Sequence, residues 1–286
     1  MKIDFVEWSK NNKNIVKELA QNNSEGIFIS YLDFSITSRC TLKCRECLSL
    51  MQYYEHPTNY NIDKMYFALD FLKNNVDIIE ELRILGGEPF VNPEVYKICS
   101  KALDNDHIRN VVFFTNATVL PSAEKMSEWD TKRVKFYISD YRIKHQNIKQ
   151  FIDLIDSLGF DYYVQHFQNW IKHSDIQYVD MPEEERNRLY KMCPGRSCPV
   201  IIEDRFYVCE YVANVCELKA VPLNTDNYYD MHKNRNKGKN EFKKYIERRT
   251  APEACKYCSR MITSDNPTFV EPAVQLSKPL KYNHYC

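Results

Sequence analysis

Short apolar runs alternate with helically spaced apolar positions from residue 31 to residue 164. The runs have the length and composition of buried strands, which we expect at 31–37, 82–85, 111–114, 134–139 and 162–164. Between them, apolar side chains recur every three or four residues, which predicts helices at 62–76, 95–103, 121–129 and 148–158. This alternation favours an α/β fold in which helices cover a parallel sheet, curled or doubly wound. In either form, binding sites gather where the strands end.

The pattern differs towards both ends of the chain. A short polar helix is expected at 15–21. After residue 181 we expect a charged helix at 182–192, a hairpin of 200–202 with 206–208, and a loop over 224–240. The sequence therefore divides into an N-terminal helical segment (1–30), a main α/β domain (31–180) and a small cysteine-rich α+β extension with its tail (181–286).

The charge balance excludes two classes of partner. The 286 residues contain 39 Lys and Arg against 39 Asp and Glu, so no net field attracts nucleic acid or an anionic membrane, and we expect neither as a partner. No run approaches the ~18 apolar residues of a membrane span, and the first residues lack the apolar core of a signal peptide. A cytoplasmic location is therefore expected, where the 11 cysteines stay reduced and are available to metals.

The first cysteine group follows the strand expected at 31–37. Cys40, Cys44 and Cys47 form a CxxxCxxC pattern on one loop. Three thiolates on a tight loop can bind three irons of a [4Fe-4S] cluster and leave the fourth iron open. Positive charge nearby favours thiolate over thiol, and three basic residues flank these thiols: Arg39, Lys43 and Arg45. Buried structural cysteines, or half of a zinc site, are the alternative interpretation.

A glycine pair follows the strand expected at 82–85. Gly86, Gly87, Glu88 and Pro89 stand together in a chain that has only six glycines. Bare glycine backbone lets a ligand approach closely, so that carbonyl oxygens can accept hydrogen bonds from an ammonium group. Taken alone, a glycine pair after a strand indicates an ordinary turn.

Together the two motifs resemble the radical SAM superfamily, over roughly residues 34–163. The resemblance implies a partial (β/α)6 TIM-like barrel, with Cys40, Cys44 and Cys47 as ligands of a [4Fe-4S] cluster. The open iron of that cluster would chelate the amino and carboxylate groups of S-adenosyl-L-methionine, and residues 86–88 would position the amino end. Reductive cleavage would give methionine and a 5′-deoxyadenosyl radical that abstracts hydrogen from a substrate.

Other strand ends match the superfamily less specifically. Thr115, Asn116 and Ser139, with the neighbouring Asp140, stand where the superfamily often contacts the ribose or carboxylate of the cofactor. Helix capping is the alternative role. One departure is Glu46, which occupies a position that is usually aromatic and close to the adenine, so adenine recognition is unassigned.

A second cysteine group lies in the extension. Cys193, Cys198 and Cys209 are followed far downstream by Cys255 and Cys258, an arrangement that resembles the twitch form of the SPASM extension. The resemblance implies an auxiliary [4Fe-4S] cluster. We favour Cys198, Cys209, Cys255 and Cys258 as its ligands, with Cys193 as a substitute or extra ligand. A four-cysteine zinc site is the alternative.

Three cysteines remain outside both groups. Cys99 lies on the apolar side of an expected helix, which favours a core position. Cys216 is either inert or a donor of hydrogen to a substrate radical, and Cys286 has no assigned role. His166, near the end of an expected strand, faces either the site or solvent.

The resemblance implies an oxidoreductase or epimerase. The expected substrate is a small polar metabolite such as a sugar, nucleotide-sugar or aminocyclitol, because too few residues precede Tyr31 for a leader-binding domain. A flavodoxin- or ferredoxin-like protein would donate the electron. The alternatives are modification of a ribosomally made peptide or another protein, and a non-catalytic metal-binding scaffold.

Overall fold

The computed structural model describes residues 1–172, 175–259 and 268–286 and divides into two compact units. The first unit consists of Met1–Thr41 and Thr58–Phe167, and the second of Leu42–Pro57 and Gln168–Cys286. These bounds differ from the expected segments, because the boundary follows Phe167 and residues 42–57 belong to the second unit. Residues 42–57 belong to the second unit because main-chain hydrogen bonds join residues 43–45 to residues 274–276 of the tail.

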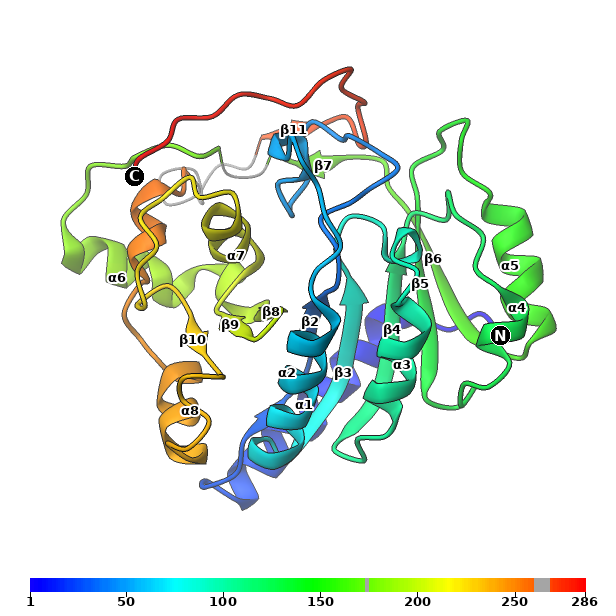
Figure 1. Cartoon of the computed structure of the whole chain (residues 1–286), viewed down its shortest axis with the longest axis horizontal. Coiled ribbons are helices and arrows are strands. Elements are labelled where there is room, and N and C mark those ends of the chain that lie inside the picture. The colour runs from blue at the N-terminus through cyan, green and yellow to red at the C-terminus, as the bar shows by residue number, and fades with distance from the viewer. Residues whose placement is uncertain (173–174, 260–267) are drawn as a thin grey trace. The chain divides into compact units, whose positions relative to one another are not determined.

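The first unit is built on a parallel sheet. Its strands are β1 (Phe28–Ile29), β2 (Leu32–Ser35), β3 (Ile78–Leu85), β4 (Ile108–Thr115), β5 (Val134–Asp140) and β6 (Asp161–His166). They lie in the order β2-β3-β4-β5-β6, all parallel, and β1 pairs with β3 ahead of β2 (Figure 1). In the described part of the chain the order does not return from β6 to β2, so this parallel sheet is open. The predicted α/β fold with a partial barrel is therefore confirmed.

One helix of the first unit precedes its strands, and the others follow strands in turn. They are α1 (Phe5–Asn22), α2 (Ile62–Asn75), α3 (Val95–Leu103), α4 (Ala123–Met126), α5 (Ile148–Ser157) and the 3-10 helix η2 (Pro89–Val91). Helix α5 fits its prediction closely: it ends before Gly159, whose φ of 79° is the left-handed conformation that glycine tolerates. By contrast, α1 begins at Phe5 and is much longer than the helix expected at 15–21.

Alternate residues of the central strands face opposite sides of the sheet. On one side, Phe113 stacks on Phe136 with ring centroids 5.4 Å apart, and Phe151 of α5 packs edge-on against Phe136. On the other side, Phe5 of α1 meets the edge of Tyr137 at 5.0 Å. The sheet is thus covered on both faces, which leaves the carboxyl ends of its strands as the place for polar side chains.

The second unit contains short elements around the later cysteines. Its helices are α6 (Glu183–Met192), α7 (Glu210–Glu217), α8 (Lys239–Ile246) and the 3-10 helices η1 (Met51–Tyr53), η3 (Pro194–Ser197) and η4 (Glu253–Tyr257). Its strands are β7 (Trp170–Ile171), β8 (Val200–Ile202), β9 (Arg205–Tyr207), β10 (Tyr229–Asp230) and β11 (Phe269–Val270). β8 and β9 form the predicted hairpin, and β7 pairs with β11.

One expectation for the second unit needs correction. The loop expected at 224–240 contains β10, which pairs with β9, and the first residues of α8. Helix α7, whose N-cap is Cys209, was not predicted. None of the helices in the described residues combines the length and apolar character needed to cross a bilayer.

Candidate metal and cofactor site

The glycine pair packs directly against the cysteine loop at the carboxyl edge of the first unit. The Gly87 N–H donates to the Thr37 carbonyl, and the Glu88 N–H donates to the Arg39 carbonyl, both at 2.9 Å. A Cβ added at Gly86 or Gly87 would lie far inside van der Waals contact with the carbonyl oxygens of Thr37 and Arg39, respectively. Gly86 also has φ 149°. Close approach of the two loops therefore requires both glycines, whatever ligand binds there.

The Glu88 side chain points into the protein and joins two strand ends. It is fully buried, and its carboxylate accepts hydrogen bonds from the Thr115 hydroxyl and the Asn116 N–H, both at 2.8 Å. The Phe90 N–H donates to it at 3.3 Å. Burial raises the pKa of Glu88 to about 7, against the lowering effect of these donors. The carboxylate thus fixes the end of β3 to the end of β4.

The Asn116 side chain extends this network to the first cysteine. Its Nδ2 donates to the Cys40 Sγ at 3.6 Å and to the Thr41 hydroxyl at 3.4 Å. Its Oδ1 accepts from the Thr118 N–H at 3.0 Å, which orients the amide with nitrogen towards the sulfur. A donor aimed at sulfur suits a thiolate, the form of cysteine that binds iron.

Two further contacts bring the ends of β4, β5 and β6 together. Gln146 Nε2 donates to the carbonyls of Asn116 and Ser139, each at 2.7 Å. His166 Nδ1 lies 2.8 Å from the Asp140 carboxylate, and this histidine is exposed. Sequence reasoning missed Gln146, because a single glutamine in a loop carries no motif. It did place Asp140 and His166 at strand ends.

The rest of the cysteine loop belongs to the second unit. The Cys47 N–H donates to the Cys44 carbonyl at 3.3 Å, and Gln275 Nε2 donates to the Cys44 Sγ at 3.2 Å. Without a bound metal, burial rather than the flanking basic residues dominates for these two thiols: it raises the pKa of Cys44 and raises that of Cys47 to about 12. A bound metal ion deprotonates such thiols on coordination, so a raised pKa is compatible with a role of these thiols as metal ligands.

The five cysteines of the extension also lie in the second unit. Cys193 ends α6, Cys198 ends η3, Cys209 caps α7, and Cys255 and Cys258 lie in and after η4. Burial raises the pKa of both Cys209 and Cys255.

Neighbouring thiols add to the rises in the pKa of Cys209 and Cys255. Cys193 and Cys258 act on both Cys209 and Cys255, whereas Cys198 acts on Cys209. No group of three potential ligand side chains in the described residues is close enough to enclose a single metal ion. In a [4Fe-4S] cluster each thiolate binds its own iron.

Three cysteines belong to neither group: Cys99, Cys216 and Cys286. Cys99 is fully buried in α3, which confirms the core position predicted for it. Cys216 is buried in α7, and burial raises the pKa of its thiol to about 12. Cys286 is exposed, and its Sγ donates to the Lys219 carbonyl at 3.3 Å.

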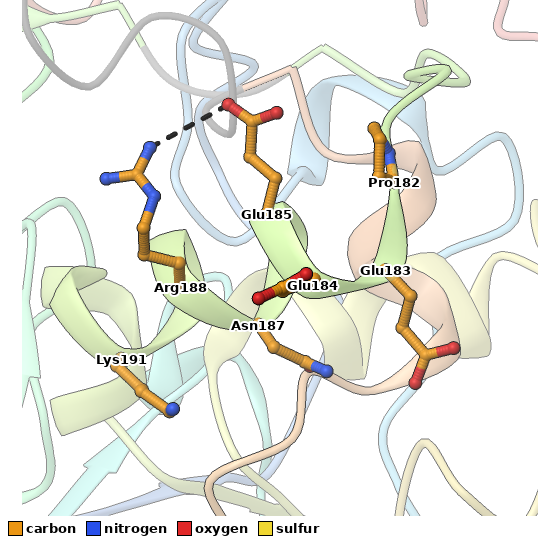
Figure 2. A pocket seen from close by; sticks show the side chains of 7 residues that line it. All are labelled: Pro182, Glu183, Glu184, Glu185, Asn187, Arg188 and Lys191. Atoms are coloured by element: carbon orange, nitrogen blue, oxygen red, sulfur yellow. Dashed lines mark ion pairs between the residues drawn. The ribbon is translucent and has the colours of Figure 1, made fainter.

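A hollow along α6 offers no comparable chemistry. It has a volume of about 990 Å³ and is lined by one face of the helix and the proline before it (Figure 2). Arg188 lies 3.7 Å from Glu185, and both side chains are largely exposed. Exposed ion pairs of this kind contribute little to stability, and the helix is the solvated, charged segment predicted at 182–192.

Comparisons with known proteins give sequence relatives but no family model, since none matches. The chain is 31% identical over 142 residues to GTP 3',8-cyclase of Clostridium acetobutylicum, over 48% of this chain and 44% of that one. It is 31% identical over 112 residues to molybdenum cofactor biosynthesis protein 1 of Bos taurus, over 36% of this chain and 17% of that one. The chain thus spans less than half the length of these curated relatives.

One solved structure that resembles the fold is BtrN in complex with AdoMet and 2-DOIA. It aligns with a TM-score of 0.49 and 10% identity, over 82% of this chain and 94% of that one. GTP 3',8-cyclase is a radical SAM enzyme. The sequence relatives therefore confirm the resemblance to the radical SAM superfamily that the cysteine loop and residues 86–89 indicate.

Proposed function

We propose that this chain is a radical SAM enzyme that oxidises or epimerises a small polar metabolite. The observation that carries the proposal is the direct packing of the glycine pair against the loop of Cys40. Two hydrogen bonds join these segments, and side chains at both glycines are excluded. The glycine motif and the first cysteine of the loop therefore stand together at the carboxyl ends of the strands, the part of such sheets where ligands usually bind.

Cys40, Cys44 and Cys47 would bind the [4Fe-4S] cluster, which supplies an electron that cleaves S-adenosyl-L-methionine. Residues 86–88 would position the amino end of this cofactor. Because the Glu88 carboxylate is already occupied by Thr115 and Asn116, that contribution falls to main-chain carbonyls of the loop. Thr115, Asn116 and Ser139 stand at neighbouring strand ends, where they would border the ribose or carboxylate.

The cysteines of the extension would bind an auxiliary [4Fe-4S] cluster. The support is that all five cysteines lie in one unit, where the Cys193 Sγ and the Cys209 Cβ both lie within 4 Å of the position that a Cβ on Gly195 would take. Four cysteine ligands saturate such a cluster, which favours a structural or electron-transfer role. Anaerobic iron, sulfide and zinc analysis separates this proposal from a zinc site: about eight irons indicate two clusters, and about four irons with one zinc indicate the alternative.

The polar strand ends support a hydroxyl-rich substrate. Asp140 and His166 pair at the ends of β5 and β6, and together they offer both acceptors and a donor to substrate hydroxyls. A sugar, nucleotide-sugar or aminocyclitol fits this chemistry. The relatives named GTP 3',8-cyclase add a purine nucleotide as a second candidate, together with the rearrangement that their name implies. A flavodoxin- or ferredoxin-like protein would supply the electron.

One experiment separates these substrates. Anaerobically reconstituted protein, reduced with dithionite, is incubated with S-adenosyl-L-methionine and one candidate at a time: GTP, nucleotide-sugars, aminocyclitols or short peptides. The candidate that raises 5′-deoxyadenosine formation and is itself altered identifies the class. Stimulation by a peptide alone would favour peptide modification. Stoichiometric iron without any 5′-deoxyadenosine would favour a non-catalytic scaffold.

A further inference from the structure

The C-terminal tail pairs with the cysteine loop inside the second unit. Two main-chain hydrogen bonds form this antiparallel pairing, from the Arg45 N–H to the Val274 carbonyl at 2.9 Å and from the Leu276 N–H to the Lys43 carbonyl at 2.8 Å. Between them, Cys44 faces Gln275 with no main-chain hydrogen bond joining the two residues directly. Side chains approach most closely in such a pair, so the register puts the Gln275 amide beside the Cys44 thiol.

The network around Gln275 fixes which atom of its amide faces the sulfur. The Lys43 N–H donates to Oε1 at 2.8 Å, so Oε1 must be the oxygen. Nε2 then donates to the Ala273 carbonyl at 2.6 Å and to the Cys44 Sγ at 3.2 Å. If the amide were reversed, its N–H group would face the Lys43 N–H and its oxygen would face the Ala273 carbonyl. The donor to sulfur is therefore determined by main-chain partners on both sides.

The turn before Gln275 holds this arrangement in place. Ala273 is buried and has φ 53°, a left-handed conformation that costs energy in a residue other than glycine. The turn aims its carbonyl at the Gln275 amide, two residues ahead. Because the amide is fixed by the tail and the loop together, its N–H is oriented before any ligand binds, and little side-chain entropy is lost when it donates.

We propose that Gln275 is a positioning residue that tunes the reduction potential of the [4Fe-4S] cluster bound through Cys44. This inference rests on the proposed function, since it takes Cys44 as a cluster ligand. Hydrogen bonds to ligand sulfurs are among the factors that set cluster potentials. An N–H aimed at sulfur stabilises the reduced cluster more than the oxidised one, because the reduced cluster carries more negative charge on its ligands. Gln275 thus makes the cluster easier to reduce.

Two substitutions test this in the full-length, anaerobically reconstituted protein. Gln275→Leu removes the donor while keeping a side chain of similar size. Gln275→Glu keeps an acceptor for the Lys43 N–H but puts negative charge beside the sulfur. Gln177→Leu is the matched control, since Gln177 is exposed in the same unit. The readouts are iron per chain and the midpoint potential, from redox titration of the EPR signal that changes on addition of S-adenosyl-L-methionine.

Both Gln275 variants are expected to bind as much iron as the parent protein. Their ratio of reduced to oxidised cluster at a fixed potential is expected to fall about threefold to tenfold, where tenfold corresponds to a shift of 59 mV for one electron. Gln177→Leu is expected to match the parent. An unchanged midpoint potential in both variants overturns the inference, and loss of the cluster from both shows that Gln275 only fastens the loop. A parent protein without any signal that responds to S-adenosyl-L-methionine overturns the proposed function instead.

Discussion

The Glu88 carboxylate accepts a hydrogen bond from the Asn116 N–H at 2.8 Å, inside the first unit and out of contact with water. Asn116 in turn donates from its side chain to the Cys40 sulfur. A residue of the glycine motif therefore determines the position of a residue that contacts the cysteine loop. Glu88 thus holds Thr115 and Asn116 in place behind the cysteine loop.

This burial makes the stability of the apo protein depend on pH through Glu88. Its pKa is about 7 in the folded chain against an ordinary 4.5, so the folded state binds the proton more tightly. The resulting stabilisation is complete below about pH 4.5 and is lost as pH rises through 7. At 1.36 kcal/mol for each pKa unit, the loss is on the order of 3 kcal/mol.

Denaturant unfolding of wild type and Glu88→Gln at pH 5, 6, 7 and 8 measures this effect. The glutamine does not titrate, so the free energy of unfolding of wild type minus that of the variant is expected to fall as pH rises. Other titrating groups cancel in this difference. A difference that stays constant, or grows with pH, would show that Glu88 is ionised throughout.

Gly87→Ala is expected to empty the cysteine loop of iron. The added methyl group would overlap the Arg39 carbonyl and lie 2.8 Å from the Cys40 Cβ, so the loop must move away from β3. We expect a loss of about four irons per chain relative to wild type. Gly159→Ala is the control: its Cβ meets no atom within 4 Å, although φ 79° costs about 1 kcal/mol. Equal iron content in the two variants would contradict the packing argument.

Serine substitutions identify the ligands of the proposed auxiliary cluster. A Cβ built on Gly195 would lie 3.5 Å from the Cys193 Sγ and 3.9 Å from the Cys209 Cβ, so these two side chains are neighbours, and we propose Cys193 as a ligand in place of Cys198. Cys193→Ser is therefore expected to lower iron by about four per chain, as Cys209→Ser does, while Cys198→Ser retains it. The reverse result, with iron lost only from Cys198→Ser, would restore the original ligand set.

The elements that periodicity predicted are those with a continuous apolar face. Helix α2 begins at Ile62, the first residue of the apolar pattern expected there. Only residues 15–21 of helix α1 were predicted, because the buried residues of its first half include polar ones: Asn12 donates to the buried Glu81 at 2.9 Å. Helix α7 was not predicted because its N-cap is Cys209, and cysteine is not a usual capping residue. The Cys209 sulfur accepts a hydrogen bond from the Val212 N–H.

The residues of the candidate site also divide into those that the sequence predicts and those that it does not. The cysteines and glycines were found because their spacing is itself the signal. Gln275 was not, because it lies 231 residues after Cys44 and only the fold brings the two together. The inward orientation of Glu88 was also beyond the sequence, since a motif gives a residue's identity but not the direction of its side chain.

The central claim is tested most directly by 5′-deoxyadenosine formation. Protein reconstituted anaerobically with iron and sulfide is reduced with dithionite, mixed with S-adenosyl-L-methionine and assayed beside Cys44→Ala. We predict that wild type produces 5′-deoxyadenosine and methionine and that Cys44→Ala produces neither. Equal production by the two proteins, or none from wild type that carries its full complement of iron, would contradict the account.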